Sequence, residues 1–401
     1  MTTTIGVLAF VVALLVSVMI HEWGHYKTAR HYGMKVSEFF VGFGPRLWSV
    51  RRGETEYGVK AIPAGGYVRI IGMTDLEPVA PEDEARAFYR APARQRAVVL
   101  SAGSFMHLVI GFVLLLVVFG ILGRPQLSTT VGSVSTCVPT AASASCTAGD
   151  PASPASAAGI QPGDVLVSFN GTPITSWEQA TTLIRSAPGE TVSIVVKRDG
   201  NQVPLTVTVA SVQRTAASGG TTAVGLLGVS SQLVMERSNP LAAVGQAFSG
   251  MWQILKGTVQ ALWSLPQKVV ELWQTLFSDQ PRDPNGLVGV VGAADISGQL
   301  AGGGDGYPVV ARAGDILLLI AGFNLFVGVF NMLPLLPLDG GHLAVVGYES
   351  VRSWLARRRG RPDPGRVDMN KLMPLAYAVF VLFVGLTVLL VTADIVKPVQ
   401  L

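Results

Sequence analysis

The sequence has unusually few charged residues. Asp, Glu, Lys and Arg make up 14% of the 401 residues, while hydrophobic residues make up 49%. Soluble domains carry about 25% charged residues, so the shortage excludes an ordinary soluble enzyme and favours a membrane protein. The net charge is +4, but the basic residues crowd into short stretches beside apolar runs. That is a membrane-topology pattern, and we expect no nucleic-acid partner.

Cysteine is nearly absent. Cys137 and Cys146 are the two in the chain, and no C-x-x-C spacing occurs, which argues against a zinc ribbon. They lie close together in a polar region. Such a pair forms a disulfide in an oxidising compartment, and two free thiols are the alternative.

Long apolar runs are present in four places. They span residues 5–20, continuing to about residue 26, then 97–122, 316–338 and 373–396. Each suits a transmembrane helix of about 20 residues. The first run lacks the basic n-region and the A-x-A cleavage site of a signal peptide. We therefore predict four transmembrane helices.

The distribution of Lys and Arg predicts the orientation of these helices. Residues 27–96 hold twelve, residues 352–371 hold seven, and the 190 residues of 123–312 hold ten. Loops rich in Lys and Arg stay in the cytoplasm. We therefore expect 27–96 and 352–371 to be cytoplasmic, and 123–312, with both cysteines, to lie outside.

The segments between the apolar runs predict smaller elements. In 36–72, aromatic and β-branched residues alternate around an Arg-Arg-Gly-Glu turn, which indicates a β-hairpin or small sheet at the cytoplasmic membrane face. It is either a surface hairpin or an edge that pairs with an extended substrate. Residues 238–279 predict two amphipathic helices divided at Pro266, lying on the outer membrane surface or packing on the neighbouring domain. Residues 280–306 predict a loop.

Residues 125–212 predict a compact β-rich domain. The runs 192–198 and 203–209 flank an Asp-Gly turn, as in a hairpin. The motif AGIQPGD at 158–164, followed by Asn170-Gly171, resembles PDZ domains of bacterial envelope proteases. The predicted fold class is thus a polytopic α-helical membrane protein with four transmembrane helices, a membrane-associated β-hairpin and one extracytoplasmic PDZ domain.

The first apolar run ends in a candidate catalytic motif. His21 and His25 of His-Glu-Trp-Gly-His are four residues apart, so on a helix both point to one face. Neutral imidazoles at that spacing chelate Zn²⁺, and Glu22 beside them suits a general base toward a zinc-activated water. Ionisable groups in a membrane are costly unless they are paired or ligate something.

The third apolar run supplies a candidate third ligand, since a catalytic zinc takes three protein ligands and keeps one open position. Asp339 is the acidic residue of the stretch NMLPLLPLDGGH at 331–342. Pro334 and Pro337 break a helix there, which a membrane tolerates only around protein or a watery cavity. A helix-end cap is the alternative role for Asp339. His342 either contacts one of the ligands or merely lies at the membrane interface, and we do not expect it to be a ligand.

The two motifs together resemble the site-2 protease family of intramembrane zinc metalloproteases. GFGP (42–45), PAGGY (63–67), the PDZ insertion and LVGVVGAA (287–294) follow the order of the regulator-of-sigma-E protease branch, in its mycobacterial form. The resemblance places helices and catalytic motifs in 1–122 and 313–401, the latter with the NxxPxxxLDG motif. It implies zinc held by His21, His25 and Asp339, with Glu22 as base, and a substrate or oxyanion role for Asn331.

The same resemblance implies the substrates and the setting of the reaction. They are single-pass membrane proteins in the cell membrane, such as anti-sigma factors already cut by a site-1 protease in an envelope stress response. Three alternatives stay open: a non-proteolytic scaffold whose PDZ domain recruits partners, a metal transporter, and a metalloprotease that uses Glu349 as the third ligand. In relatives the second span begins with a stretch containing Gly-Pro and Asn. Residues 102–107 lack the Pro and Asn, so no role is assigned there.

Overall fold

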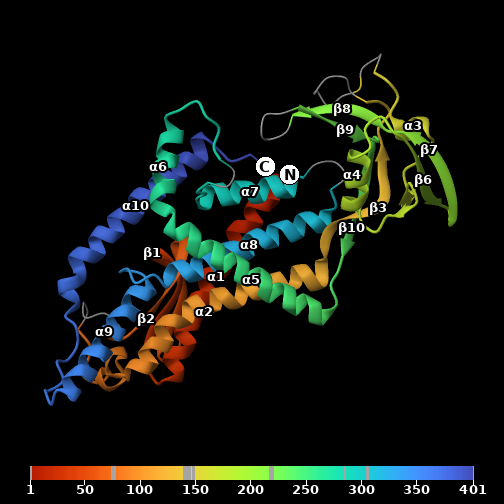
Figure 1. The fold of residues 1–401 in the computed structure, drawn as a ribbon. Coiled ribbons are helices and arrows are strands. Elements are labelled where there is room, and N and C mark those ends of the chain that lie inside the picture. The colour runs from red at the N-terminus through yellow and green to blue at the C-terminus, as the bar shows by residue number, and fades with distance from the viewer. Residues whose placement is uncertain are drawn as a thin grey trace. The chain divides into compact units, whose positions relative to one another are not determined.

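The computed structural model describes residues 2–73, 78–138, 146, 150–215, 221–283, 286–303 and 307–400. The chain divides into two compact units, one made of residues 1–122 and 237–401 and the other of residues 123–236. Figure 1 labels the elements of both units. The division separates the helical, apolar part of the chain from a β-rich insertion.

Four helices of the first unit are long and apolar enough to cross a membrane. They are α1 (Thr2–His31), α2 (Ala93–Val117) with its π-helical continuation to Leu122, α8 (Val309–Asn331), and α10 (Met373–Val396), which follows a 3₁₀ turn from Met369. Each overlaps one of the four predicted spans. Their length and composition indicate an integral membrane protein.

The third span ends earlier than predicted. Helix α8 stops at Asn331, and a turn over 332–338 leads into α9 (Asp339–Arg358). Proline lacks an N–H and disfavours helical backbone in the residue before it, so Pro334 and Pro337 keep the chain out of the helix. A β-carbon at position 340 would stand 2.3 Å from the carbonyl of Met332. Only glycine allows α9 to begin so close to the end of α8.

The predicted hairpin at 36–72 is confirmed. Strands β1 (Val36–Arg52) and β2 (Thr55–Ile70) pair antiparallel from Val36 opposite Ile70 to Arg52 opposite Thr55. The base of the hairpin packs with the last turns of α1 and with the start of α2 in a buried apolar cluster; its members include Tyr26, Ala29, Met34, Val36, Ile70, Val99 and Leu100. The hairpin is thus fixed to the end of α1 that carries the His-Glu motif.

The prediction of a loop over 280–306 is wrong for half of that segment, because 290–302 form helix α7 (Val290–Gly302). The carboxylate of Asp394 in α10 accepts a hydrogen bond from the N–H of Gly292 (2.8 Å), so it satisfies the first turn of α7. Ser297 donates to the carbonyl of Gly6 in α1 (2.9 Å). Small residues allow this close contact. Residues far from α7 in the sequence therefore supply both its N-terminal cap and the surface on which it packs.

Residues 238–279 form the two predicted helices, α5 (Pro240–Trp263) and α6 (Leu265–Leu276). Pro266 lies in the first turn of α6, where a missing N–H costs nothing. Ala243 and Ala247 of α5 are buried in a cluster that contains Leu115 of α2 and Leu325 of α8. Helix α5 thus packs on two of the spans, an arrangement that neither hypothesis for this segment included.

The second unit is a β-rich domain with strands β3 (Arg124–Val134), β4 (Val165–Phe169), β5 (Thr172–Pro173), β6 (Thr191–Arg198), β7 (Asn201–Thr208), β8 (Ala210–Thr215), β9 (Thr221–Leu226) and β10 (Val229–Glu236), and helices α3 (Pro154–Ala157) and α4 (Trp177–Arg185). The main sheet has the order β10-β3-β4-β6-β7, and β8 pairs with β9. The predicted hairpin of 192–198 with 203–209 is present as β6 and β7. A disulfide joins Cys137 to Cys146.

The predicted end of this domain at residue 212 is wrong, because the unit continues to Glu236. Strand β10 returns to pair with β3, from Val229 opposite Val134 to Glu236 opposite Arg124. Pairing between strands about 100 residues apart leaves no local mark in the sequence. The structure therefore adds β9 and β10 to the domain predicted for 125–212.

Candidate metal centre

Two histidines of α1 present their side chains to one point. His21 and His25 are one helical turn apart, and both are buried. Their Nε2 atoms lie 3.1 Å from each other. Two lone pairs at that distance repel unless a proton or a cation lies between or beside them. The pair is therefore suited to hold a positive charge.

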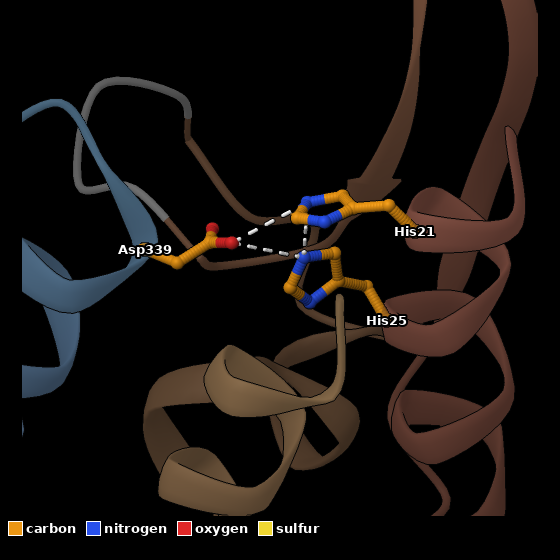
Figure 2. Close-up of side chains that lie close together, drawn as sticks. All are labelled: His21, His25 and Asp339. Atoms are coloured by element: carbon orange, nitrogen blue, oxygen red, sulfur yellow. Dashed lines mark hydrogen bonds and ion pairs between the residues drawn. The ribbon is translucent and has the colours of Figure 1, made fainter. Parts of the chain in front are cut away.

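Asp339 lies far from the two histidines in the sequence, but its carboxylate lies next to them. As the first residue of α9 it directs Oδ2 toward both rings, 3.4 Å from Nε2 of His21 and 3.3 Å from Nε2 of His25. Figure 2 shows the carboxylate facing the two imidazoles across the gap between α1 and α9. Within the described residues, these three form the one group of His, Cys, Asp or Glu whose ligand atoms all lie within 4.8 Å of one another.

The donor set fits a zinc ion. Oδ2 of Asp339 is buried and has no hydrogen-bond donor within the described parts of the chain, although a buried carboxylate oxygen normally has one. Two imidazole nitrogens and one carboxylate oxygen form a common ligand set of catalytic zinc, which keeps a fourth position open. A cation among the three atoms would satisfy the unpaired oxygen and relieve the repulsion between the nitrogens.

The ring of His25 is held in the orientation that a metal requires. Its Nδ1 lies 2.7 Å from the carbonyl oxygen of Val99 in α2. A carbonyl only accepts, so Nδ1 carries the proton and Nε2 keeps its lone pair. Metal-binding histidines usually have such a partner on the second nitrogen. Val99 gave no sign of this role in the sequence, because a backbone carbonyl contributes regardless of the side chain.

Glu22 lies beside the group without belonging to it. Its carboxylate is close enough to interact electrostatically with His21, His25 and Asp339, and it lies against the backbone of Val68 in β2. A carboxylate in this position is suited to take a proton from a water near the three ligand atoms. The structure therefore brings together the four residues that the two motifs indicated.

The remaining sequence candidates do not belong to the group of three ligand residues. Asn331 is the half-buried last residue of α8, just before the turn that leads to Asp339. His342 lines a cavity with Arg96 and Glu349. Glu349 pairs with Arg96 (2.9 Å) and accepts from the N–H of Val367 (2.9 Å), so its carboxylate is already engaged. This arrangement argues against Glu349 as the third ligand.

Sequence reasoning assigned no role to two residues of α2 that lie next to His21 and His25, or to a residue of α8 that bonds to one of them. A β-carbon at Gly103 would stand 2.4 Å from Nε2 of His25. The ring of His107 lies 5.0 Å from that of His21, centroid to centroid, and its Nδ1 lies 2.9 Å from Oδ1 of Asn324. A polar residue inside an apolar span indicates a functional role. This signal could have identified His107 and Asn324 from the sequence.

The chain is similar in sequence to known proteins. A family model described as peptidase family M50 matches residues 9–362. The chain is 39% identical to a protein named zinc metalloprotease Rip1 from Mycobacterium tuberculosis and 37% identical to the Rip1 of Mycolicibacterium smegmatis, each over 99% of this chain and 98% of the relative. It is 32% identical to metalloprotease MmpA of Caulobacter vibrioides, over 86% of this chain and 88% of that protein.

Proposed function

The chain belongs to peptidase family M50, the site-2 proteases, and on that premise we propose that it cleaves single-pass membrane proteins within the bilayer. Membership makes it a zinc metalloendopeptidase and an integral membrane protein. The site of cleavage in our proposal is the group formed by His21, His25 and Asp339, with Glu22 as the base.

One observation carries the assignment of the ligands. Oδ2 of Asp339, buried and without a hydrogen-bond donor among the described residues, lies 3.3 and 3.4 Å from the Nε2 atoms of the two histidines. Bound zinc supplies Lewis-acid chemistry, polarising a carbonyl and acidifying a water. The ligands come from α1 and α9, and the turn at 332–338 lets the second helix reach the first. The zinc site is thus divided between two segments that are far apart in the sequence.

Glu22 moves the protons in this proposal. Its carboxylate takes a proton from the attacking water and then delivers it to the amine of the leaving peptide. The position of the side chain beside all three ligands supports this role. For Asn331 we propose contact with the substrate, since its amide N–H groups suit a backbone carbonyl or the oxyanion that forms from it.

The β-hairpin is the proposed guide for the substrate. A transmembrane helix satisfies its own amides, so it must unwind before a carbonyl reaches the zinc. An extended segment can pair with an exposed strand. The backbone of Val68 in β2 lies against Glu22, so a segment aligned along this hairpin would pass the base.

The proposed orientation follows the basic residues. Residues 27–96 and 352–371 are rich in Lys and Arg, which puts the hairpin and the metal centre near the cytoplasmic face and residues 123–236 outside. For the β-rich unit we propose a PDZ domain, on its AGIQPGD motif. It acts as a size filter or binds a newly exposed C-terminus. The proposed substrates are anti-sigma factors after a first cut outside, in envelope stress signalling.

Co-expression with a tagged single-pass membrane substrate of the anti-sigma class tests the function. The wild-type chain should shorten the substrate, and Glu22→Gln should slow cleavage by about 10² to 10⁴-fold, the usual contribution of a general base. Glu178→Gln, at an exposed glutamate of α4, is the matched control and should cleave normally. Cleavage at the wild-type rate by Glu22→Gln would contradict the role of Glu22 as the base. If the wild-type chain failed to shorten the substrate, a non-proteolytic membrane scaffold would be favoured instead.

A further inference from the structure

We infer that His107, held by Asn324, is a positioning residue that orients the zinc ligand His21. The inference rests on the proposed metal centre. It starts from an asymmetry between the two histidines of α1. His25 has a partner on each ring nitrogen, whereas Nδ1 of His21 is buried with no hydrogen-bond partner among the described residues.

Nδ1 of His21 must carry a proton when Nε2 binds a metal, because a neutral imidazole has one protonated nitrogen and one nitrogen with a free lone pair. A buried N–H without an acceptor destabilises the folded protein, because the group has lost its hydrogen bond to water. The acceptor on the second nitrogen also sets the angle at which the ring meets the metal. For His25, the carbonyl of Val99 is the acceptor on the second nitrogen. For His21, we look for an acceptor among its other neighbours.

His107 is the neighbour whose ring faces that of His21. The two ring centroids are 5.0 Å apart at an interplanar angle of 44°. His107 is 2% exposed, and it lies one turn after Gly103 on the side of α2 that approaches α1. It does not belong to the group of ligand atoms within 4.8 Å, so it adjoins the metal site without being one of its ligands.

The protonation of His107 follows from Asn324. The side-chain Nδ2 of Asn324 donates to the carbonyl of Ile320 (2.8 Å), which leaves Oδ1 as the acceptor for Nδ1 of His107 (2.9 Å). Nδ1 of His107 is therefore the protonated nitrogen, and Nε2 keeps a lone pair. The ring that carries this neutral acceptor is fixed by a second helix and lies beside the ring of His21. In our inference, Nε2 of His107 is the acceptor for Nδ1–H of His21 once a metal holds the ring of His21.

Zinc affinity of the purified full-length protein, measured by competition with a chelator, tests the inference. His107→Phe keeps a ring but removes the acceptor, and it should weaken zinc binding by about 10 to 100-fold, as loss of an outer partner does at other zinc sites. His107→Gln keeps an acceptor and should restore most of the affinity. Asn324→Leu releases the ring of His107 and should weaken binding in the same direction.

Thr258→Val is the matched control, because Thr258 is a buried polar residue of α5 outside the metal centre. The zinc affinity of this variant should equal that of the wild type. The visible spectrum of the cobalt-substituted protein should shift in His107→Phe and not in the control. Wild-type affinity in both His107→Phe and Asn324→Leu, or equal losses in His107→Phe and His107→Gln, would overturn the inference. Failure of the proposed metal centre is distinguishable, because His21→Ala would then also bind zinc like the wild type.

Discussion

Gly103 of α2 lies directly against His25 of α1. A β-carbon at position 103 would stand 2.4 Å from Nε2 of His25 and 2.6 Å from Nε2 of His21. No real β-carbon makes contacts so short. The absence of a side chain at Gly103 therefore leaves room around the two nitrogens that we propose as metal ligands.

Gly103→Ala should reduce zinc content and activity together. The new methyl group enters the space between the ligands, and either the rings rotate or α2 moves away, at a cost of about 1–3 kcal/mol. Metal analysis of the purified protein checks the result. Gly322→Ala is the control within a span, because nothing lies within 4 Å of a β-carbon there. Full zinc content in Gly103→Ala would show that the rings tolerate the methyl group.

Glu349→Ala should destabilise the protein and leave its zinc in place. The substitution leaves the half-buried Arg96 without its partner (2.9 Å). Breaking a fully buried pair costs about 3–5 kcal/mol, which is the upper end of the expected loss. A thermal melt and a zinc measurement on the same sample separate the two effects. Loss of zinc from a still folded Glu349→Ala protein would revive the hypothesis that Glu349 is a ligand.

The stability of the β-rich unit should fall at low pH through Asp164. The Arg198 guanidinium, which donates to both carboxylate oxygens (2.8 and 2.7 Å), holds the pKa of Asp164 below its usual value. Because the folded pKa is lowered, the stabilisation is fully present above the unfolded pKa of about 3.9 and is lost as the pH falls through the folded value.

Asp164→Asn should therefore cost about 2 kcal/mol at neutral pH, the typical loss of a charged hydrogen bond. The difference from the wild type should shrink below the unfolded pKa. Protease susceptibility of the unit within the full-length protein, followed against pH, measures both effects. Glu190→Gln, at an exposed residue, serves as the control. A difference that does not change with pH would assign the loss to packing instead of charge.

The spans and the hairpin could be predicted because their patterns are local. An apolar run of about 20 residues needs no partner to be identified, and alternation around Arg51-Arg52-Gly53-Glu54 sets the pairing of β1 with β2. Asp339 could be proposed because an acidic residue in an apolar stretch demands a reason. Binding of zinc by these residues stays a proposal.

Other features depend on contacts that the sequence does not display. Helix α7 is capped by Asp394, about 100 residues away, and β10 joins β3 across a similar distance. The importance of Gly103 follows only from the approach of α2 to α1. His107 and Asn324 stood out as polar residues in spans, but their hydrogen bond joins two helices whose contact local patterns do not reveal.

The zinc content of Asp339→Ala tests the central claim most directly, because the claim is a single metal site divided between α1 and α9. Elemental analysis of the purified protein should find about one zinc per chain in the wild type, as for a single catalytic site, and little in Asp339→Ala. Asp315→Ala, which loses the bond from Tyr307 (2.7 Å) at the far end of α8, should keep its zinc. A wild-type zinc content in Asp339→Ala would contradict the account.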